Sequence, residues 1–286
     1  MPSERMGQLS ILLACVFFAA AAVSAKYLAA GYSGLFVSLV RFGLGAVFCV
    51  LALAWLRREW RVQGWRVWAI RGILGSLAMS LTYWAIQLTS SGRAILLADT
   101  YPIFVAIFGY LFFREAITRR HVGGLIVGML GVLLVFYDRS QYGWLGNLLA
   151  FGAGVVGGVS VHYVKLARSR NNPFLVYLSA CLFGLIWCLV SAGEVRHLNG
   201  QGAFALVLVA VFGFVGQVLA GYGFKYVSAT TGGIAGLAEV PLTVAFSALL
   251  GEEMRPRFWL GTVLIVAGIL INYYPGRRAR GDREPA

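Results

Sequence analysis

The chain has 286 residues, of which 59% are hydrophobic and 12% are charged, and its mean hydropathy is +0.78. A soluble protein of this composition would have too few polar residues to cover its surface, so we expect an integral membrane protein. The formal net charge of +13 does not indicate a nucleic-acid partner, because the basic residues lie mainly between the apolar runs and on one side of the membrane.

Ten apolar runs, most of them close to 20 residues long, follow one another along the chain. They predict an all-α protein with ten transmembrane helices, since the runs lack the strict alternation of a membrane barrel. The first run is too long, and too poor in basic residues at its start, for a cleaved signal peptide. The ten runs are 7–30, 34–56, 67–89, 92–113, 120–137, 143–166, 173–192, 203–227, 231–250 and 258–274.

The basic residues predict how the chain is oriented. If the N-terminus lies inside, the segments that face the cytoplasm hold most of the 24 lysines and arginines. The positive-inside rule then places both termini in the cytoplasm, in a plasma membrane of the bacterial inner-membrane type. Residues 276–286 would form a basic cytoplasmic tail. One of the segments counted as cytoplasmic contains Arg57, Arg58, Arg61, Arg66 and Arg71.

An internal repeat divides the chain. Pro102 is matched by Pro241 at a spacing of 139 residues, and Glu115 is matched by Glu253 at a spacing of 138. The pattern predicts two units, 1–137 and 138–275, with five spans each. Because five is odd, the second unit must enter the membrane from the opposite face, so we expect two inverted five-helix repeats around a central cavity. This architecture is typical of alternating-access transporters.

Several motifs carry a family resemblance. They are Lys26-Tyr27, Val40-Arg41-Phe42, the segment 85–91, and the run from Tyr101-Pro102 to Glu115 and Gly123 with its counterpart from Val240-Pro241 to Gly261. With these motifs the chain resembles the EamA-type members of the drug/metabolite transporter superfamily. The resemblance implies export or exchange of small metabolites, among them amino acids, as in the YddG-type exporters of aromatic amino acids. Phe17 and Phe18 stand where that family often has a tryptophan.

Ionisable residues inside the spans are candidates for function, because burying them in a membrane costs free energy. Asp99 and Glu239 lie near the two repeated prolines. Either carboxylate could carry a proton or bind a substrate ammonium, or it could pair with a structural arginine; we favour Glu239 as the more functional of the two. Arg41 either binds a substrate carboxylate or neutralises Asp99. Lys26 either pairs with a charge or extends its ammonium to the membrane surface.

Aromatic residues on the spans predicted to surround the cavity are further candidates. They are Tyr83, Trp84, Tyr101, Tyr163 and Tyr222, whose rings can stack on a solute.

Three residues leave two interpretations open. His162 either titrates near neutral pH at the substrate site or packs as a hydrogen-bonded residue. Pro102 and Pro241 lack an N–H, so each produces either a gate hinge or a static kink in its span.

No catalytic motif accompanies these residues. The sequence has no P-loop, no G-x-S-x-G and no metal-ligand spacing, so we expect neither an enzyme nor a cofactor nor a metal site. The expected partners are the lipid bilayer and a small-molecule substrate, with proton coupling open and oligomeric state undetermined. The predicted function is a secondary transporter that exports amino acids or related metabolites. The alternative is a multidrug or nucleotide-sugar carrier, and a membrane enzyme or scaffold is disfavoured.

Overall fold

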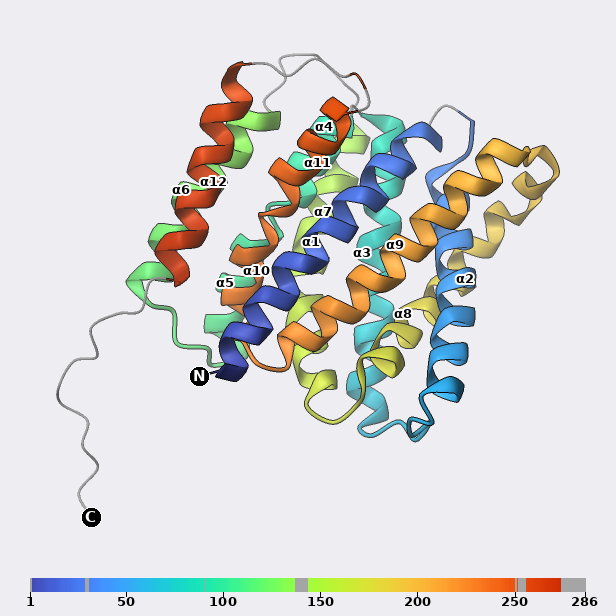
Figure 1. Cartoon of the computed structure of the whole chain (residues 1–286), viewed down its shortest axis with the longest axis horizontal. Helices are drawn as coiled ribbons and strands as arrows, with labels where there is room; N and C mark the ends of the chain where they lie inside the picture. The colour runs from blue at the N-terminus through green and yellow to red at the C-terminus, as the bar shows by residue number, and fades with distance from the viewer. Residues whose placement is uncertain are drawn as a thin grey trace.

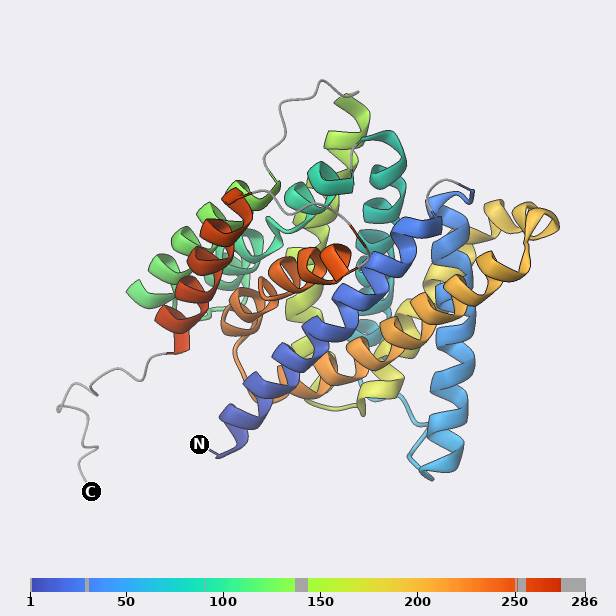
Figure 2. The same ribbon diagram turned by 45° about the horizontal axis from the view of Figure 1, so that its top comes forward.

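The computed structural model describes residues 2–28, 31–89, 91–136, 144–249, 251 and 256–273. All regular elements in these ranges are helices, which confirms the all-α prediction. Figures 1 and 2 show them as one bundle. In chain order they are α1 (Pro2–Leu28), α2 (Gly34–Trp55), α3 (Trp65–Leu88), α4 (Ser91–Ala98), α5 (Tyr101–Phe112), α6 (Arg119–Phe136), α7 (Trp144–Arg168), α8 (Pro173–Cys188), the 3-10 helix η1 (Leu189–His197), α9 (Gly200–Phe224), α10 (Ala229–Gly236), α11 (Glu239–Leu249) and α12 (Pro256–Tyr273).

The lengths of these helices agree with a multi-pass membrane protein. Within the described residues, nine helical segments are long and apolar enough to cross a membrane. Two of the nine combine a pair of shorter helices, α4 with α5 and α10 with α11, and a third joins α8 to η1. The remaining predicted run corresponds to α6, which has 18 residues and begins with two arginines.

Short polar residues begin several of the helices. Ser33, Asn172 and Asn199 precede α2, α8 and α9, and each side-chain oxygen accepts a hydrogen bond from a backbone N–H in the first turn that follows. Such caps satisfy donors that have no partner within the helix, which is why the chain turns at these positions.

Two spans are broken near their middle. The first break lies at Asp99 and Thr100, between α4 and α5, and the second at residues 237–238, between α10 and α11. Pro102 and Pro241 follow within the first turn of α5 and of α11. A proline is tolerated there because the N–H that it lacks would have no helical partner. Each repeated proline therefore begins a half-helix rather than bending a continuous one.

Helix packing relates the two halves of the chain. α1 packs against α9 and α3 packs against α7, while α5 contacts α7, α11 contacts α1, and α6 contacts α12. If α1 is exchanged with α7, α3 with α9, α5 with α11 and α6 with α12, the same set of pairs results. Both views show α6 with α12 at one end of the bundle and α2 at the other. This exchange is the pattern that two repeats related by a pseudo-two-fold axis would produce.

Glycines allow the α6–α12 pair to approach closely. A Cβ on Gly131 would lie 2.5 Å from the carbonyl oxygen of Gly261, and one on Gly261 would lie 2.7 Å from that of Gly131. Gly124 and Gly268 show the same reciprocal arrangement, at 2.6 and 2.5 Å. Small residues at a helix interface are typical of membrane proteins, where close packing replaces the hydrophobic drive between helices.

Candidate functional site

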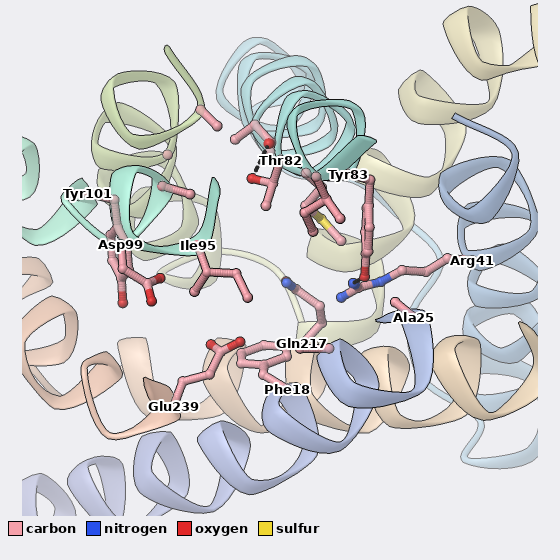
Figure 3. Close-up of a pocket in the computed structure, with 18 of the residues that line it drawn as sticks. Phe18, Ala25, Arg41, Thr82, Tyr83, Ile95, Asp99, Tyr101, Gln217 and Glu239 are labelled. Carbon is pink, nitrogen blue, oxygen red and sulfur yellow. Dashed lines mark hydrogen bonds between the residues drawn. The ribbon is translucent and has the colours of Figure 1, made fainter. Parts of the chain in front are cut away.

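A cavity of about 510 Å³ lies between the two halves. Residues from α1, α2, α3, α4, α5, α7, α9 and α11 line it, whereas none from α6 or α12 does. Its volume is in the range of small-molecule sites. Figure 3 shows side chains that point into it from several helices. The polar and charged lining residues are Tyr32, Arg41, Arg71, Thr82, Tyr83, Gln87, Asp99, Tyr101, Ser160, Gln217, Glu239, Thr243 and Ser247.

The carboxylates of Asp99 and Glu239 lie on one side of the cavity (Figure 3). Asp99 occupies the break before α5, and Glu239 is the first residue of α11. Each carboxylate therefore stands at the N-terminal end of a half-helix, where the helix dipole favours a negative charge. One oxygen of Asp99, Oδ2, is buried and has no hydrogen-bond partner among the residues that the structure describes. Because two carboxylates line this side of the cavity, it is suited to a cationic group of a solute.

Tyr101 joins the two broken spans beside these carboxylates. Its hydroxyl donates a hydrogen bond to the backbone oxygen of Gly233 in α10, at 3.3 Å. A Cβ on Gly236 would lie 1.9 Å from that hydroxyl oxygen. A larger residue at position 236 would therefore force the Tyr101 hydroxyl to shift. The hydrogen bond of Tyr101 connects α5 of the first half with α10 of the second.

Arginines occupy the other side of the cavity. Nη1 of Arg41 donates to the hydroxyl of Tyr83 at 2.5 Å, and the guanidinium lies 5.7 Å from the centre of the Tyr83 ring. Nη2 of Arg71 donates to Oε1 of Gln217 at 3.2 Å. Arg41 is 6% exposed and Arg71 is 3% exposed. Guanidinium groups that line a cavity are suited to binding an anion.

Arg71 and Gln217 were missed by the sequence analysis. The charge pattern assigns Arg71 to a cytoplasmic segment, but α3 begins at Trp65, which places Arg71 in the second turn of a helix and inside the bundle. A signal was available, since Arg71, Gly75, Ala78 and Thr82 share one face at helical spacing and all line the cavity. Gln217 was detectable as a lone polar residue in an apolar run.

Of the residues predicted from the sequence, five line the cavity: Arg41, Tyr83, Asp99, Tyr101 and Glu239. Trp84 and Tyr222 do not line it and are 40% and 36% exposed. The ring of Tyr222 instead lies 5.3 Å from that of Tyr226. Lys26 lies in α1, and its side chain is outside the described part of the structure.

His162 and Tyr163 also lie away from the cavity. Nε2 of His162 is 2.8 Å from the backbone oxygen of Val105, and the imidazole stacks on the ring of Phe113 at 4.2 Å. The ring of Tyr163 meets that of Phe113 edge-on at 5.8 Å. These contacts hold α7 against α5 and the segment that follows it, which is the packing interpretation of His162.

A second polar cluster joins the two halves outside the cavity. Glu115, between α5 and α6, accepts hydrogen bonds from the backbone N–H groups of Ala229 at 2.9 Å and Thr230 at 3.2 Å, where α10 begins. It also accepts from the hydroxyl of Thr230 at 2.9 Å and pairs with Nζ of Lys165 at 3.2 Å. Burial opposes ionisation, but the hydrogen bonds and the ammonium outweigh it and lower the pKa of Glu115 below its usual 4.5.

Comparison with known proteins decides the family. The sequence model of the EamA-like transporter family matches residues 5–137 and, a second time, residues 144–274. The chain belongs to the EamA-like transporter family. It is therefore a membrane transporter by family, in agreement with the multi-pass helical fold and the central cavity.

Two of the similar proteins have names that describe transport. The chain is 24% identical to an uncharacterised transporter of Clostridium kluyveri, over 99% of this chain and 97% of that protein. It is 24% identical to the pseudopaline exporter CntI of Pseudomonas aeruginosa, over 73% of this chain and 76% of that protein. A solved crystal structure matches with a TM-score of 0.75 at 19% identity, over 96% of this chain and 99% of that one, which shows that the fold is shared.

Proposed function

We propose that this EamA-family transporter exports amino acids, or small metabolites with the same charged groups, across the plasma membrane by alternating access. The observation that carries the proposal is the separation of charge in the cavity. Asp99 and Glu239 line one side, and Arg41 lies on the other with Tyr83 (Figure 3). An amino acid presents an ammonium and a carboxylate, which match these two sides.

The charges in the cavity strengthen the binding of both the ammonium and the carboxylate of the solute. Hydrogen bonds that involve charged groups are shorter and about twice as strong as neutral ones. In a site with little water they are also less screened. Phe18, whose ring lies beside Glu239 in Figure 3, adds an apolar surface for the remainder of the solute. Export as the direction is supported by the relative named as a pseudopaline exporter.

Movement would arise from the two repeats, 1–137 and 138–275. The breaks before Pro102 and Pro241 place irregular backbone next to the cavity, and the half-helices on either side of each break can change their angle. In this proposal the breaks serve as hinges, and both termini lie in the cytoplasm.

Counterflow in proteoliposomes tests the proposal. Vesicles loaded with an unlabelled amino acid should accumulate the same labelled amino acid transiently, and protein-free vesicles should not. A panel of aromatic, apolar, polar and acidic amino acids identifies the range, and a parallel series with a pH gradient shows whether protons are coupled. Exchange of a nucleotide sugar or a drug, with no amino acid exchanged, would refute the substrate assignment and favour the alternative carrier.

A further inference from the structure

The basic side of the cavity holds more positive charge than one carboxylate requires. Arg41 and Arg71 both line it, on α2 and α3. We propose that these two arginines together bind a dianionic end of the solute, so that the transported compound is an amino acid with an additional acidic group. The inference rests on the proposed function and names the substrate class more closely.

Contacts with α9 place the two guanidinium groups near one another. A Cβ on Gly213 would meet Nε of Arg41 at 2.6 Å and its Cζ at 2.9 Å. Arg71 donates to Gln217, which is four residues further along the same helix. Residues four apart lie on one face of a helix and are separated by roughly 6 Å along its axis. Both guanidinium groups therefore face one short stretch of α9.

Gly75 leaves room for the Arg71 side chain on α3. A Cβ on Gly75 would lie 1.5 Å from Nη1 of Arg71, so the side chain lies over the place that a larger residue would fill. Gly75 is itself part of the cavity lining. The guanidinium thus extends along α3 into the cavity, away from the start of the helix at Trp65.

Neither guanidinium forms a direct ion pair with a carboxylate in the described part of the chain. Among the residues that the structure describes, no carboxylate lies within 4.0 Å of Arg41 or Arg71, and the ion pair found there joins Lys165 to Glu115. Within the described ranges, Nε of Arg41, and Nε and Nη1 of Arg71, are buried and have no hydrogen-bond partner. Tyr83 and Gln217 orient the arginines but carry no charge.

Two buried positive charges of this kind favour an anion. Arginine remains protonated in proteins, and an uncompensated buried charge costs several kcal/mol. A group with two negative charges can pair directly with both guanidinium groups, whereas a single carboxylate can pair fully with only one of them. The ammonium of the same solute would then face Asp99 and Glu239 on the opposite side (Figure 3).

Matched solutes test the dianion directly. Binding to the purified full chain, measured by equilibrium dialysis, and counterflow in proteoliposomes should be compared for glutamate against glutamine and for O-phosphoserine against serine. Glutamate and glutamine have nearly the same shape and differ in negative charge, whereas O-phosphoserine adds both a phosphate and its negative charge to serine. We expect the acidic member of at least one pair to bind tenfold or more tightly than its neutral partner. Success with glutamate would assign a second carboxylate, and success with O-phosphoserine a phosphate.

Variants then assign the preference to the arginines. Gln217→Glu places a carboxylate beside Arg71 and should abolish the preference for the acidic solute while raising the melting temperature, because it neutralises a buried charge. Arg71→Gln should abolish the preference as well. Arg66→Gln removes an exposed arginine from the same helix and serves as the control, for which the preference should be unchanged.

The outcomes separate this inference from the proposed function. Counterflow of glutamine and serine at the same affinity as glutamate and O-phosphoserine would overturn the dianion while amino-acid transport stands. A strong preference for acidic solutes that survives in both Gln217→Glu and Arg71→Gln would also overturn it. If none of the four compounds binds or exchanges, and other amino acids fail too, the proposed function falls together with this inference.

Discussion

Replacing Glu239 by glutamine removes one negative charge from the cavity with little change of shape. Glu239 begins α11 and faces the cavity next to Phe18. If its carboxylate binds the ammonium of the solute, the variant replaces a charge-assisted hydrogen bond, which contributes about 1.5–3 kcal/mol, by a weaker one to a neutral amide oxygen. Since each 1.4 kcal/mol corresponds to a factor of ten, transport at low substrate concentration should fall by about 10- to 100-fold.

Asp99→Asn is the matched comparison, and we expect a smaller loss. One of the two oxygens of Asp99 is sealed from solvent, so only the other is available to a solute. About half of the interaction energy corresponds to a reduction of about three- to tenfold. The assay is the initial rate of counterflow in proteoliposomes with equal amounts of folded transporter.

Stability must be followed in the same samples. The negative charge at the start of α11 interacts with the helix dipole, and its loss costs about 0.3–1 kcal/mol, a minor part of the stability of a folded protein. Transport should therefore fall far more than the melting temperature of the purified variant would explain. Wild-type rates for both Glu239→Gln and Asp99→Asn would refute a role for these carboxylates.

Three further predictions concern the residues that connect the helices. Glu115→Gln should lower the free energy of unfolding by about 1–3 kcal/mol at neutral pH. Because the pKa of Glu115 in the folded protein lies below 4.5, the difference in melting temperature between variant and wild type should narrow as the pH falls below that value. A difference that is independent of pH would contradict this account. Gly236→Ala should lower the free energy of unfolding by about 1–3 kcal/mol through its clash with Tyr101, and Tyr101→Phe in the same chain should restore most of this loss. Gly152→Ala is the neutral control, because a Cβ at that position meets nothing within 4 Å in the described residues. No rescue in the double variant would show that the clash is not the cause. His162→Phe should lower the melting temperature and leave the apparent substrate affinity in counterflow unchanged, and a selective change of affinity would assign the imidazole to the site.

Apolar run length alone predicted most of the fold. Segments of about 20 apolar residues leave a membrane-embedded backbone few alternatives to a helix, so the class follows directly from composition. The repeated prolines also indicated where the fourth span of each repeat is interrupted. The extent of the interruption was not predictable, because whether a proline bends a helix or begins a new one depends on the neighbouring helices that satisfy the freed backbone groups.

The candidate site was only partly predictable, for a different reason. Asp99 and Glu239 stand out because a charge within an apolar run is costly. Arg71 has no such signal in a hydropathy plot, since four arginines precede it within 15 residues and the helix begins only six residues before it. Trp84 and Tyr222 show the opposite case, since the sequence predicted that they face the cavity and they do not line it. Their spans line the cavity, but the rotation of each helix, which tertiary packing sets, turns these two rings away.

The most direct test of the central proposal is the accessibility of the cavity from each side of the membrane. Ala78→Cys and Ala220→Cys place a thiol in the cavity wall on α3 and α9, and the chain with its four buried native cysteines is the unlabelled control. A membrane-impermeant maleimide, applied separately to intact cells and to inverted vesicles, should label both positions from both sides. A transported amino acid should slow the labelling. Labelling from one side only, with no protection by any transported solute, would contradict alternating access through this cavity.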